Sequence, residues 1–188
     1  AAIRAGLTDI GENRVQEALA KLGPDLRAEG ASGVRWHMVG HLQRNKVRDA
    51  VALFDWVQSV DSLRLARALS DRADAGRPIQ ALIEVNATGE EQRHGLAPER
   101  AIEIGLEVAG LPGLAVRGVM AMAPWTGDQR AIRSAFRVGR DVFEGLRDTI
   151  EAPVDTLSMG MSNDFGVAVE EGASMIRLGT ALFGERER

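Results

Sequence analysis

Small and polar residues gather at two points near the end of the sequence, where they could bind an anion. The first is "SMGMSNDFG" at 158–166, in which Gly160 and Ser162 follow an apolar run. The second is Gly179 with Thr180, which precede "ALFGE". Hydroxyl groups and the backbone N–H groups at a helix start are typical ligands of phosphate. The two stretches form a candidate phosphate cradle, although Gly160 could equally be a tight turn and Ser162 a helix N-cap.

Two further stretches carry charged or amide side chains at places where a strand is expected to lie or to end. Arg177 lies in the apolar stretch "MIRLG", where an unpaired guanidinium would be costly to bury. A structural ion pair with Glu84 or Glu12 is the usual explanation of such an arginine. Asn13 in "GEN" could contact a ligand, but a cap for the following helix "RVQEALAKL" is the commoner role.

The remaining chemistry-bearing residues give weaker signals. His37 and His41 are four apart and would share one side of a strand, and His94 is the third histidine of the sequence. A zinc site would need carboxylates from distant positions, so we do not predict one. The sequence has no tyrosine, which removes the phenol as a general acid or base in this chain.

Short apolar runs that alternate with segments of helical period must position these residues. This pattern is typical of βα units with a parallel sheet. Helices are expected at 62–75, with Asp61 as N-cap and Gly76 as the stop, and at 98–109. The predicted strands are "TDIGEN" (8–13), "WHMVGH" (36–41), "FDWVQSV" (54–60), "IQALIEVN" (79–86), "LAVRGVMAM" (114–122), "VDTLSMG" (154–160) and "MIRLGTALFG" (175–184).

Seven βα units predict an α/β protein of the (β/α)8 TIM-barrel class, one unit short of closure. The 188 residues are also fewer than the roughly 250 typical of that fold. The opening "AAIRAG" resembles the end of a helix that stops at Gly6, so we expect the first βα unit to be largely absent from this sequence. Residues 1–188 are expected to form a single domain, with the chemistry at the carboxyl ends of the strands.

Composition narrows the class of protein. A net charge of −4 gives no overall attraction to nucleic acid or to an anionic membrane. The absence of cysteine excludes disulfides and thiolate metal sites from this sequence. No apolar run reaches the roughly 18 residues of a membrane span, and no signal peptide is visible. We therefore expect a cytoplasmic protein that binds neither nucleic acid nor membrane.

Seven motifs, in order along nearly the whole chain, together resemble the pyridoxal 5′-phosphate homeostasis proteins. The resemblance implies a fold-type III barrel, similar to the alanine racemase N-terminal domain, that binds pyridoxal 5′-phosphate in vitamin B6 homeostasis without established catalysis. Its implied partners are the cofactor and apo-enzymes that receive it, and the expected state is a monomer or weak dimer. The motifs are "DIGENRVQEA", "WHMVGHLQRNK", "VQSVDS", "LIEVNATGEEQRHGL", "RGVMAMAP", "LSMGMSNDF" and "IRLGTALFG".

The resemblance also assigns roles to individual residues. It implies that Ser162, Gly179 and Thr180 hold the phosphate and that Arg177 faces the pyridine nitrogen. Asn13 and Met159 would line the ring pocket, with Gly160 in its floor.

In one respect the sequence departs from the family. The family's Schiff-base lysine ends the first strand in an "SKT"-like segment, and neither Lys21 nor Lys46 matches that position. The N-terminal segment with that lysine is therefore expected to be missing from this sequence. The alternative function is a fold-type III enzyme such as an amino-acid racemase. A racemase of this architecture uses a tyrosine base, and this sequence has no tyrosine. An arginine opposite the pyridine nitrogen also leaves the ring a poor electron sink.

Overall fold

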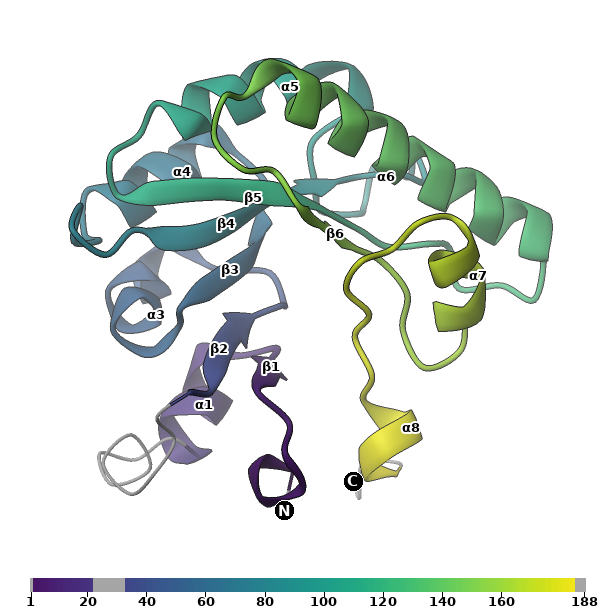
Figure 1. Ribbon diagram of the computed structural model, residues 1–188, viewed down its shortest axis with the longest axis horizontal. Coiled ribbons are helices and arrows are strands. Elements are labelled where there is room, and N and C mark those ends of the chain that lie inside the picture. The colour runs from purple at the N-terminus through teal and green to yellow at the C-terminus, as the bar shows by residue number, and fades with distance from the viewer. Residues whose placement is uncertain (1, 22–32, 185–188) are drawn as a thin grey trace.

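A parallel sheet forms the centre of the computed structural model, which describes residues 2–21 and 33–184. Each strand pairs with the next strand along the chain, so the order in the sheet is the order in the sequence. The sheet curls into a half-barrel (Figure 1). Its strands are β1 (Asp9–Glu12), β2 (Arg35–Met38), β3 (Trp56–Val60), β4 (Ile79–Val85), β5 (Leu114–Ala121) and β6 (Thr156–Ser158).

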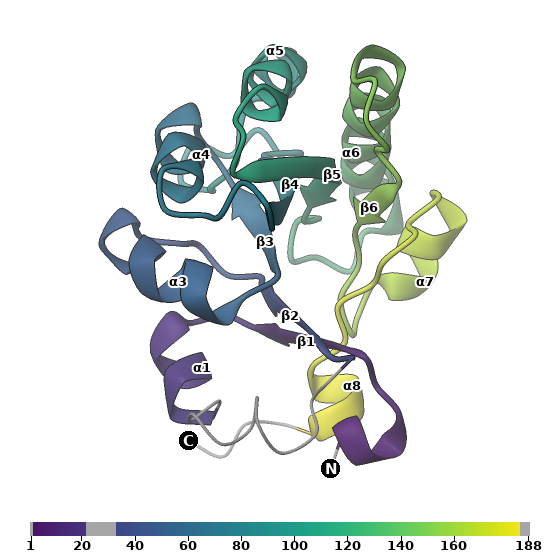
Figure 2. The same ribbon diagram turned by 60° about the vertical axis from the view of Figure 1, so that its left-hand side comes forward.

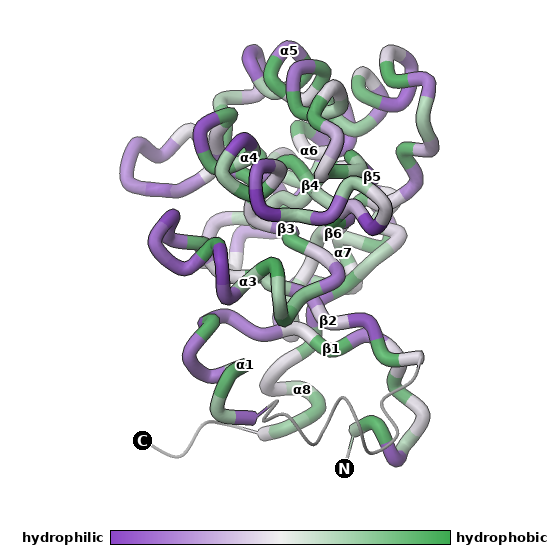
Figure 3. The backbone as a smooth tube through the Cα atoms, turned by 90° about the vertical axis from the view of Figure 1, so that its left-hand side faces the viewer, coloured by the Kyte–Doolittle hydropathy of each residue, from purple (hydrophilic) through white to green (hydrophobic). Residues whose placement is uncertain are grey.

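Helices cover the convex side of the half-barrel. Figure 2 shows α1, α3, α4, α5 and α6 around the outside of the sheet. The tube alternates between hydrophilic and hydrophobic stretches along these helices, as expected when one face packs on a sheet (Figure 3). No helix within 2–21 and 33–184 is long and apolar enough to span a membrane. The helical elements are η1 (Ile3–Ala5), α1 (Val15–Lys21), η2 (Arg44–Lys46), α3 (Val47–Leu53), α4 (Leu63–Ser70), α5 (Pro98–Ala109), α6 (Gln129–Thr149), α7 (Phe165–Glu170) and α8 (Thr180–Phe183).

The two faces of the sheet bury different sets of residues. In β4 the side chains of Ile79, Ala81, Ile83 and Val85 belong to the large core under the helices. Successive side chains of a strand point to opposite faces, and Leu82 accordingly joins a separate cluster inside the half-barrel with Trp56 and Met120. Along each strand, the polar side chains that alternate with residues of the large core under the helices (the outer core) therefore point into the concave side. The candidate site lies on that side.

The prediction of a strand at 175–184 is wrong over most of its length. Residues 175–177 do pair in parallel with β6: Met175 donates to Leu157, Met159 donates to Met175, and Arg177 donates to Gly160. The structure assigns only an isolated bridge there, between Ser158 and Met175. The chain then turns at Gly179 into α8, so the apolar residues Ala181–Phe183 are helical. The other strand predictions are confirmed to within a few residues at each end.

The helix predictions differ in accuracy. Helix α5 spans Pro98–Ala109, as predicted. Helix α4 ends at Ser70, and Gly76 is not its stop. Its N-cap is Ser62, whose Oγ accepts a hydrogen bond from the Leu65 N–H at 3.3 Å, so the assignment of Asp61 as N-cap is wrong. Adjacent residues that are both good caps cannot be separated by type alone, because the choice depends on which one has extended backbone.

Gly118 marks an irregular point in β5. The register between β4 and β5 shifts between Ala81 and Leu82, where Arg117 is the extra residue on β5. Gly118 has φ +151, and a Cβ at this position would lie 1.8 Å from the backbone oxygen of Thr156. β5 and β6 therefore approach more closely than any other residue type would permit.

Candidate functional site

Arg177 links the carboxyl ends of two strands. Its Nη1 donates to the backbone oxygen of Ser158 at 2.8 Å and to the Ser158 Oγ at 2.7 Å. Its Nη2 donates to the backbone oxygen of Ala121, the last residue of β5, at 3.1 Å. Burial lowers the pKa of Arg177 to about 10, so the guanidinium is charged at neutral pH. The structure thus holds a fixed positive charge at the carboxyl edge of the sheet.

The carboxylates proposed as ion-pair partners of Arg177 do not pair with it. Glu12 binds Lys21 instead, with the Nζ 2.8 Å from Oε1. Glu84 is close enough to influence the charge of Arg177, but within the described part of the chain Arg177 forms no ion pair. The explanation of Arg177 as a structural ion pair is therefore wrong. Backbone and hydroxyl oxygens hold the guanidinium, while Asp164 and Glu84 act on it only through their charge among the described residues.

Glu84 is itself unusual. Its side chain is 3% exposed, and its Oε2 has no hydrogen-bond partner among residues 2–21 and 33–184. Burial, together with the nearby negative charge of Asp61, raises the pKa of Glu84 to about 7, although the positive charge of Arg177 opposes the shift. The site therefore contains a buried carboxyl that is protonated below about pH 7.

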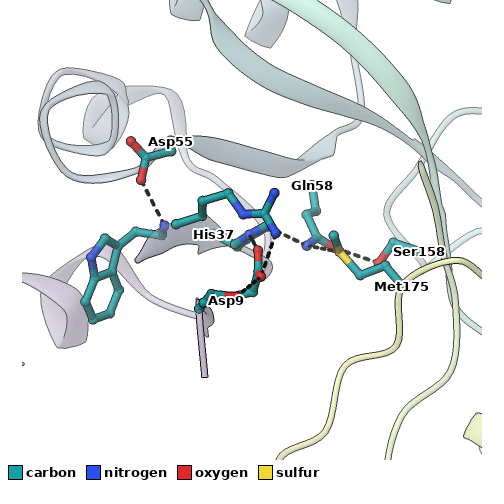
Figure 4. A network of polar contacts seen from close by, with 9 residues as sticks. Asp9, His37, Asp55, Gln58, Ser158 and Met175 are labelled. Carbon is teal, nitrogen blue, oxygen red and sulfur yellow. Dashed lines mark hydrogen bonds and ion pairs between the residues drawn. The ribbon is translucent and has the colours of Figure 1, made fainter. Parts of the chain in front are cut away.

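A chain of polar side chains crosses the concave side of the half-barrel from β1 to β6 (Figure 4). The Nε2 of His37 lies 2.9 Å from Asp9 Oδ1, and its Nδ1 lies 3.0 Å from the Nε2 of Gln58. The Oγ of Ser158 donates to the Gln58 Oε1 at 2.7 Å, and the same Oγ accepts from Arg177. Arg177, beside β6, is thereby connected to Asp9 in β1, the strand at the other edge of the sheet.

The hydrogen bonds of His37 fix its protonation state. The amide nitrogen of Gln58 can only donate, so the Nδ1 of His37 accepts and its Nε2–H donates to Asp9. Burial lowers the pKa of His37, although Asp9 opposes the shift. A neutral imidazole therefore satisfies every partner in this network.

The two halves of the predicted phosphate cradle lie together. The Ser162 Oγ accepts from the N–H of Gly179 at 3.4 Å and from that of Ala181 at 3.1 Å. Thr180 lies between these residues and begins α8. Ser162 is not the N-cap of α7, because Asp164 occupies that position. The prediction of Ser162 as the N-cap of the helix that follows it is wrong, whereas its proximity to Gly179 and Thr180 is as expected.

Gly160 and Met159 have different surroundings. Gly160 has φ +86, and a Cβ there would lie 2.6 Å from the Cβ of Ala168, so α7 packs directly on this residue. Met159 is fully buried and belongs to the core under the helices, where its sulfur lies close to Gly139 of α6. This position gives no support to a contact between the Met159 side chain and a cofactor ring. That role stays a prediction.

Asn13 and the two lysines lie elsewhere along the sheet. Asn13 is exposed and directly follows β1, and its predicted contact with the ring is untested. Lys21 ends α1 and is held by Glu12 on the helix side of β1. Lys46 ends η2. Neither lysine lies in the polar network or beside Arg177 in the hydrogen bonds that the structure shows.

Sequence reasoning missed the polar network and the state of Glu84. A signal for them does exist. His37, Gln58, Glu84 and Ser158 are polar residues within otherwise apolar strand segments, and each lies on the face opposite the large core under the helices. Polar side chains in a buried strand need partners, so their coincidence in four strands points to a shared site.

Comparison with known proteins now identifies the class. Residues 1–187 match the family model described as alanine racemase, N-terminal domain. The pyridoxal phosphate homeostasis protein of Pseudomonas aeruginosa is 42% identical over 185 residues, which cover 97% of this chain and 76% of the relative. That of Escherichia coli K12 is 39% identical over 191 residues, covering 99% and 79%. The chain belongs to the pyridoxal phosphate homeostasis protein family.

Solved structures support the same conclusion. PipY of Synechococcus elongatus with pyridoxal phosphate bound matches with a TM-score of 0.85 at 36% identity, over 97% of this chain and 84% of PipY. An alanine racemase of Clostridium difficile matches with a TM-score of 0.78 at 15% identity, over 100% and 47%. The second likeness concerns the fold alone. The six parallel strands thus form a half-barrel that matches alanine racemase N-terminal barrel domains.

Proposed function

We propose that this protein binds pyridoxal 5′-phosphate on the concave side of its half-barrel and serves in homeostasis of the cofactor. In this role it holds the cofactor and releases it to apo-enzymes without turning over a substrate. The observation that carries the proposal is the placement of Arg177 and of the Ser162–Gly179 pair at the same edge of the sheet. Family membership and the ligand of PipY support it.

The residues present fit the phosphate of this cofactor. The Ser162 Oγ already accepts hydrogen bonds from the N–H groups of Gly179 and Ala181, so these donors converge on a single point. A Cβ at Gly179 would meet nothing within 4 Å, which leaves open space beside the donors. A phosphate oxygen could take the place of the Ser162 oxygen and accept hydrogen bonds from the same two N–H groups. The hydroxyls of Ser162 and Thr180 could donate to the phosphate as well.

Arg177 favours a carrier over an enzyme. The guanidinium would face the pyridine nitrogen, and its charge makes it a donor that does not give up its proton at neutral pH. The ring nitrogen then stays unprotonated. Bound pyridoxal phosphate contributes an electron sink to amino-acid chemistry, and that sink is weak when the ring nitrogen carries no proton.

We also propose that the half-barrel is part of an eight-stranded barrel. Residues 175–177 would provide the strand after β6, because they already pair with residues 157–160 of the chain. One further strand between this segment and β1 would close the barrel. A structure of a longer chain that showed β1 unpaired on its second edge would contradict this closure.

Ser162→Ala is expected to weaken binding of pyridoxal phosphate by about 10- to 100-fold, the loss typical of one hydrogen bond to a charged group. Binding of pyridoxal, which lacks the phosphate, should not change. Titrations followed by the visible absorbance of each ligand measure both affinities. Ser134→Ala, on the exposed side of α6, is the matched control and should bind both ligands as the parent protein does.

Arg177→Gln separates the two ends of the ligand in the same titrations. Because Arg177 is assigned to the ring, this variant should lose affinity for pyridoxal and for pyridoxal phosphate alike. Circular dichroism checks that the variant folds. Equal losses of both ligands in Ser162→Ala would remove Ser162 from the phosphate site, and unchanged binding in both variants would overturn the proposed pocket.

Delivery of the cofactor is expected to be observable directly. Protein loaded with pyridoxal phosphate and freed of excess ligand should restore the activity of an apo-enzyme that depends on this cofactor. Restoration should be faster than release of the ligand into buffer, measured separately by dialysis. If enzyme activity returned only as fast as the ligand is released into buffer, active delivery would be contradicted. The proposal that the protein binds pyridoxal phosphate would be unaffected.

A further inference from the structure

Two histidines and an aspartate meet at the carboxyl edge of the sheet, outside the polar network and the phosphate cradle. The Nδ1 of His41 lies 3.1 Å from the Oδ2 of Asp61. The rings of His41 and His94 are stacked, with centroids 3.8 Å apart and planes 10° from parallel. One ligand atom from each of the three residues lies within 4.8 Å of the other two. Imidazole nitrogen and carboxylate oxygen are the donors that zinc and similar ions prefer.

Three successive βα loops bring these residues together. His41 follows β2, Asp61 comes directly after β3, and His94 lies in the loop after β4. Backbone hydrogen bonds hold the loop with His94 against β4. The Leu96 N–H donates to the backbone oxygen of Glu84 at 2.7 Å, and the Asn86 N–H donates to the backbone oxygen of Leu96 at 2.9 Å. The loop that carries His94 is therefore held at the carboxyl edge of the sheet.

A hydroxyl group outside the cluster orients its carboxylate. The Ser62 Oγ donates to the Oδ1 of Asp61 at 3.0 Å, while the same oxygen caps α4 by accepting from Leu65. One oxygen of Asp61 is thereby held by the helix start and the other faces His41. Hydrogen bonds of this kind to a ligating carboxylate are typical of built metal sites, where they orient the first ligands.

We propose that His41, Asp61 and His94 bind a divalent transition-metal ion of the zinc type. Three protein ligands leave one coordination position open, as in metal sites that exchange a water or an anion. The cluster borders a groove lined by Gln43, Arg44, Asn45 and Arg64. A small anion is therefore the exchangeable ligand that the surrounding positive charge favours.

Binding requires only a local adjustment. One nitrogen of each ring already lies within 4.8 Å of the other ligand atoms, so the ion is reached when the ring planes tilt until both lone pairs converge on it. His41 is 39% exposed and His94 is also exposed, which leaves both rings free to rotate about χ2. Asp61, 16% exposed, is the fixed member of the set.

The third histidine is an internal control for the test. His37 is buried in the polar network, bound to Asp9 and Gln58, and is absent from the cluster. In untagged protein without pyridoxal phosphate, one equivalent of Zn²⁺ should shift the ring proton resonances of His41 and His94 and leave those of His37 in place. Because no cofactor is added, the result does not depend on the proposed function.

Three variants measure the contribution of each ligand. In competition with a chromophoric zinc chelator, His41→Ala, Asp61→Asn and His94→Ala should each lower the affinity for Zn²⁺ by at least about 100-fold, because loss of a first ligand exceeds the 10- to 100-fold typical of outer partners. Asp148→Asn, an exposed aspartate of α6, should bind Zn²⁺ as the parent does. Failure of the parent to bind one equivalent, or affinity unchanged in His94→Ala, overturns the proposal.

Discussion

Gly118→Ala is expected to destabilise the folded protein severely. The new Cβ would lie 1.8 Å from the backbone oxygen of Thr156, and neither strand can move away without breaking the pairing of β5 with β6. The backbone at φ +151 is also unfavourable for any residue with a Cβ. The expected loss in the free energy of unfolding exceeds about 4 kcal/mol, a large part of the 5–15 kcal/mol of a typical domain. Urea unfolding followed by circular dichroism measures it.

Gly166→Ala provides the matched control. Gly166 lies within α7, and a Cβ there would meet no atom within 4 Å. Alanine is the better helix former, so this variant should gain about 0.5–1 kcal/mol. A Gly118→Ala protein with the stability of the parent would show that β5 and β6 can separate, contrary to the close approach described above.

Glu84→Gln is expected to stabilise the protein at pH 8 and to leave its stability nearly unchanged at pH 4.5. The pKa of Glu84 is raised from 4.5 to about 7 on folding, so the native state holds a proton that the unfolded state has lost. Stability of the parent therefore falls as pH rises between these two values and is constant above the higher one. The full cost is about 3 kcal/mol, from roughly 1.4 kcal/mol for each pKa unit. A neutral glutamine avoids this cost.

Urea unfolding at several pH values between 4.5 and 8 tests this expectation. A chelator in the buffer keeps metal ions away from Asp61, so that its charge acts on Glu84 throughout. Glu103→Gln, at an exposed position in the middle of α5, is the matched replacement of a glutamate by glutamine. Parallel curves for Glu84→Gln and the parent would show that folding does not raise the pKa of Glu84.

The regular part of the fold was predictable from the sequence, because burial on both faces gives parallel strands a continuous apolar run. β4 and β5 were located within one residue at each end for this reason. The same criterion failed at 175–184. An apolar run near the end of a chain suits a strand or a short helix equally, and only the turn at Gly179 decides between them.

The site was predictable in part. The sequence indicates Ser162 and Gly179 at expected strand ends and Arg177 as a guanidinium within an apolar stretch, and the structure brings Ser162 and Gly179 into contact. The cluster of His41, Asp61 and His94 could not be found in this way. Its members lie on three loops, and loop conformation depends on backbone hydrogen bonds such as that between Leu96 and Glu84.

The match between strand order and chain order has a consequence for synthesis on the ribosome. Each strand from β2 onward finds its partner in the strand made just before it, so pairing can proceed while the chain is still growing. Such neighbouring contacts close short loops and favour rapid folding. The hydrogen bond between Gln58 and Ser158 joins residues 100 positions apart and must wait for β6. The contacts of His37 with Asp9 and Gln58 can form earlier, so the polar network on the concave side is completed only when β6 has been made.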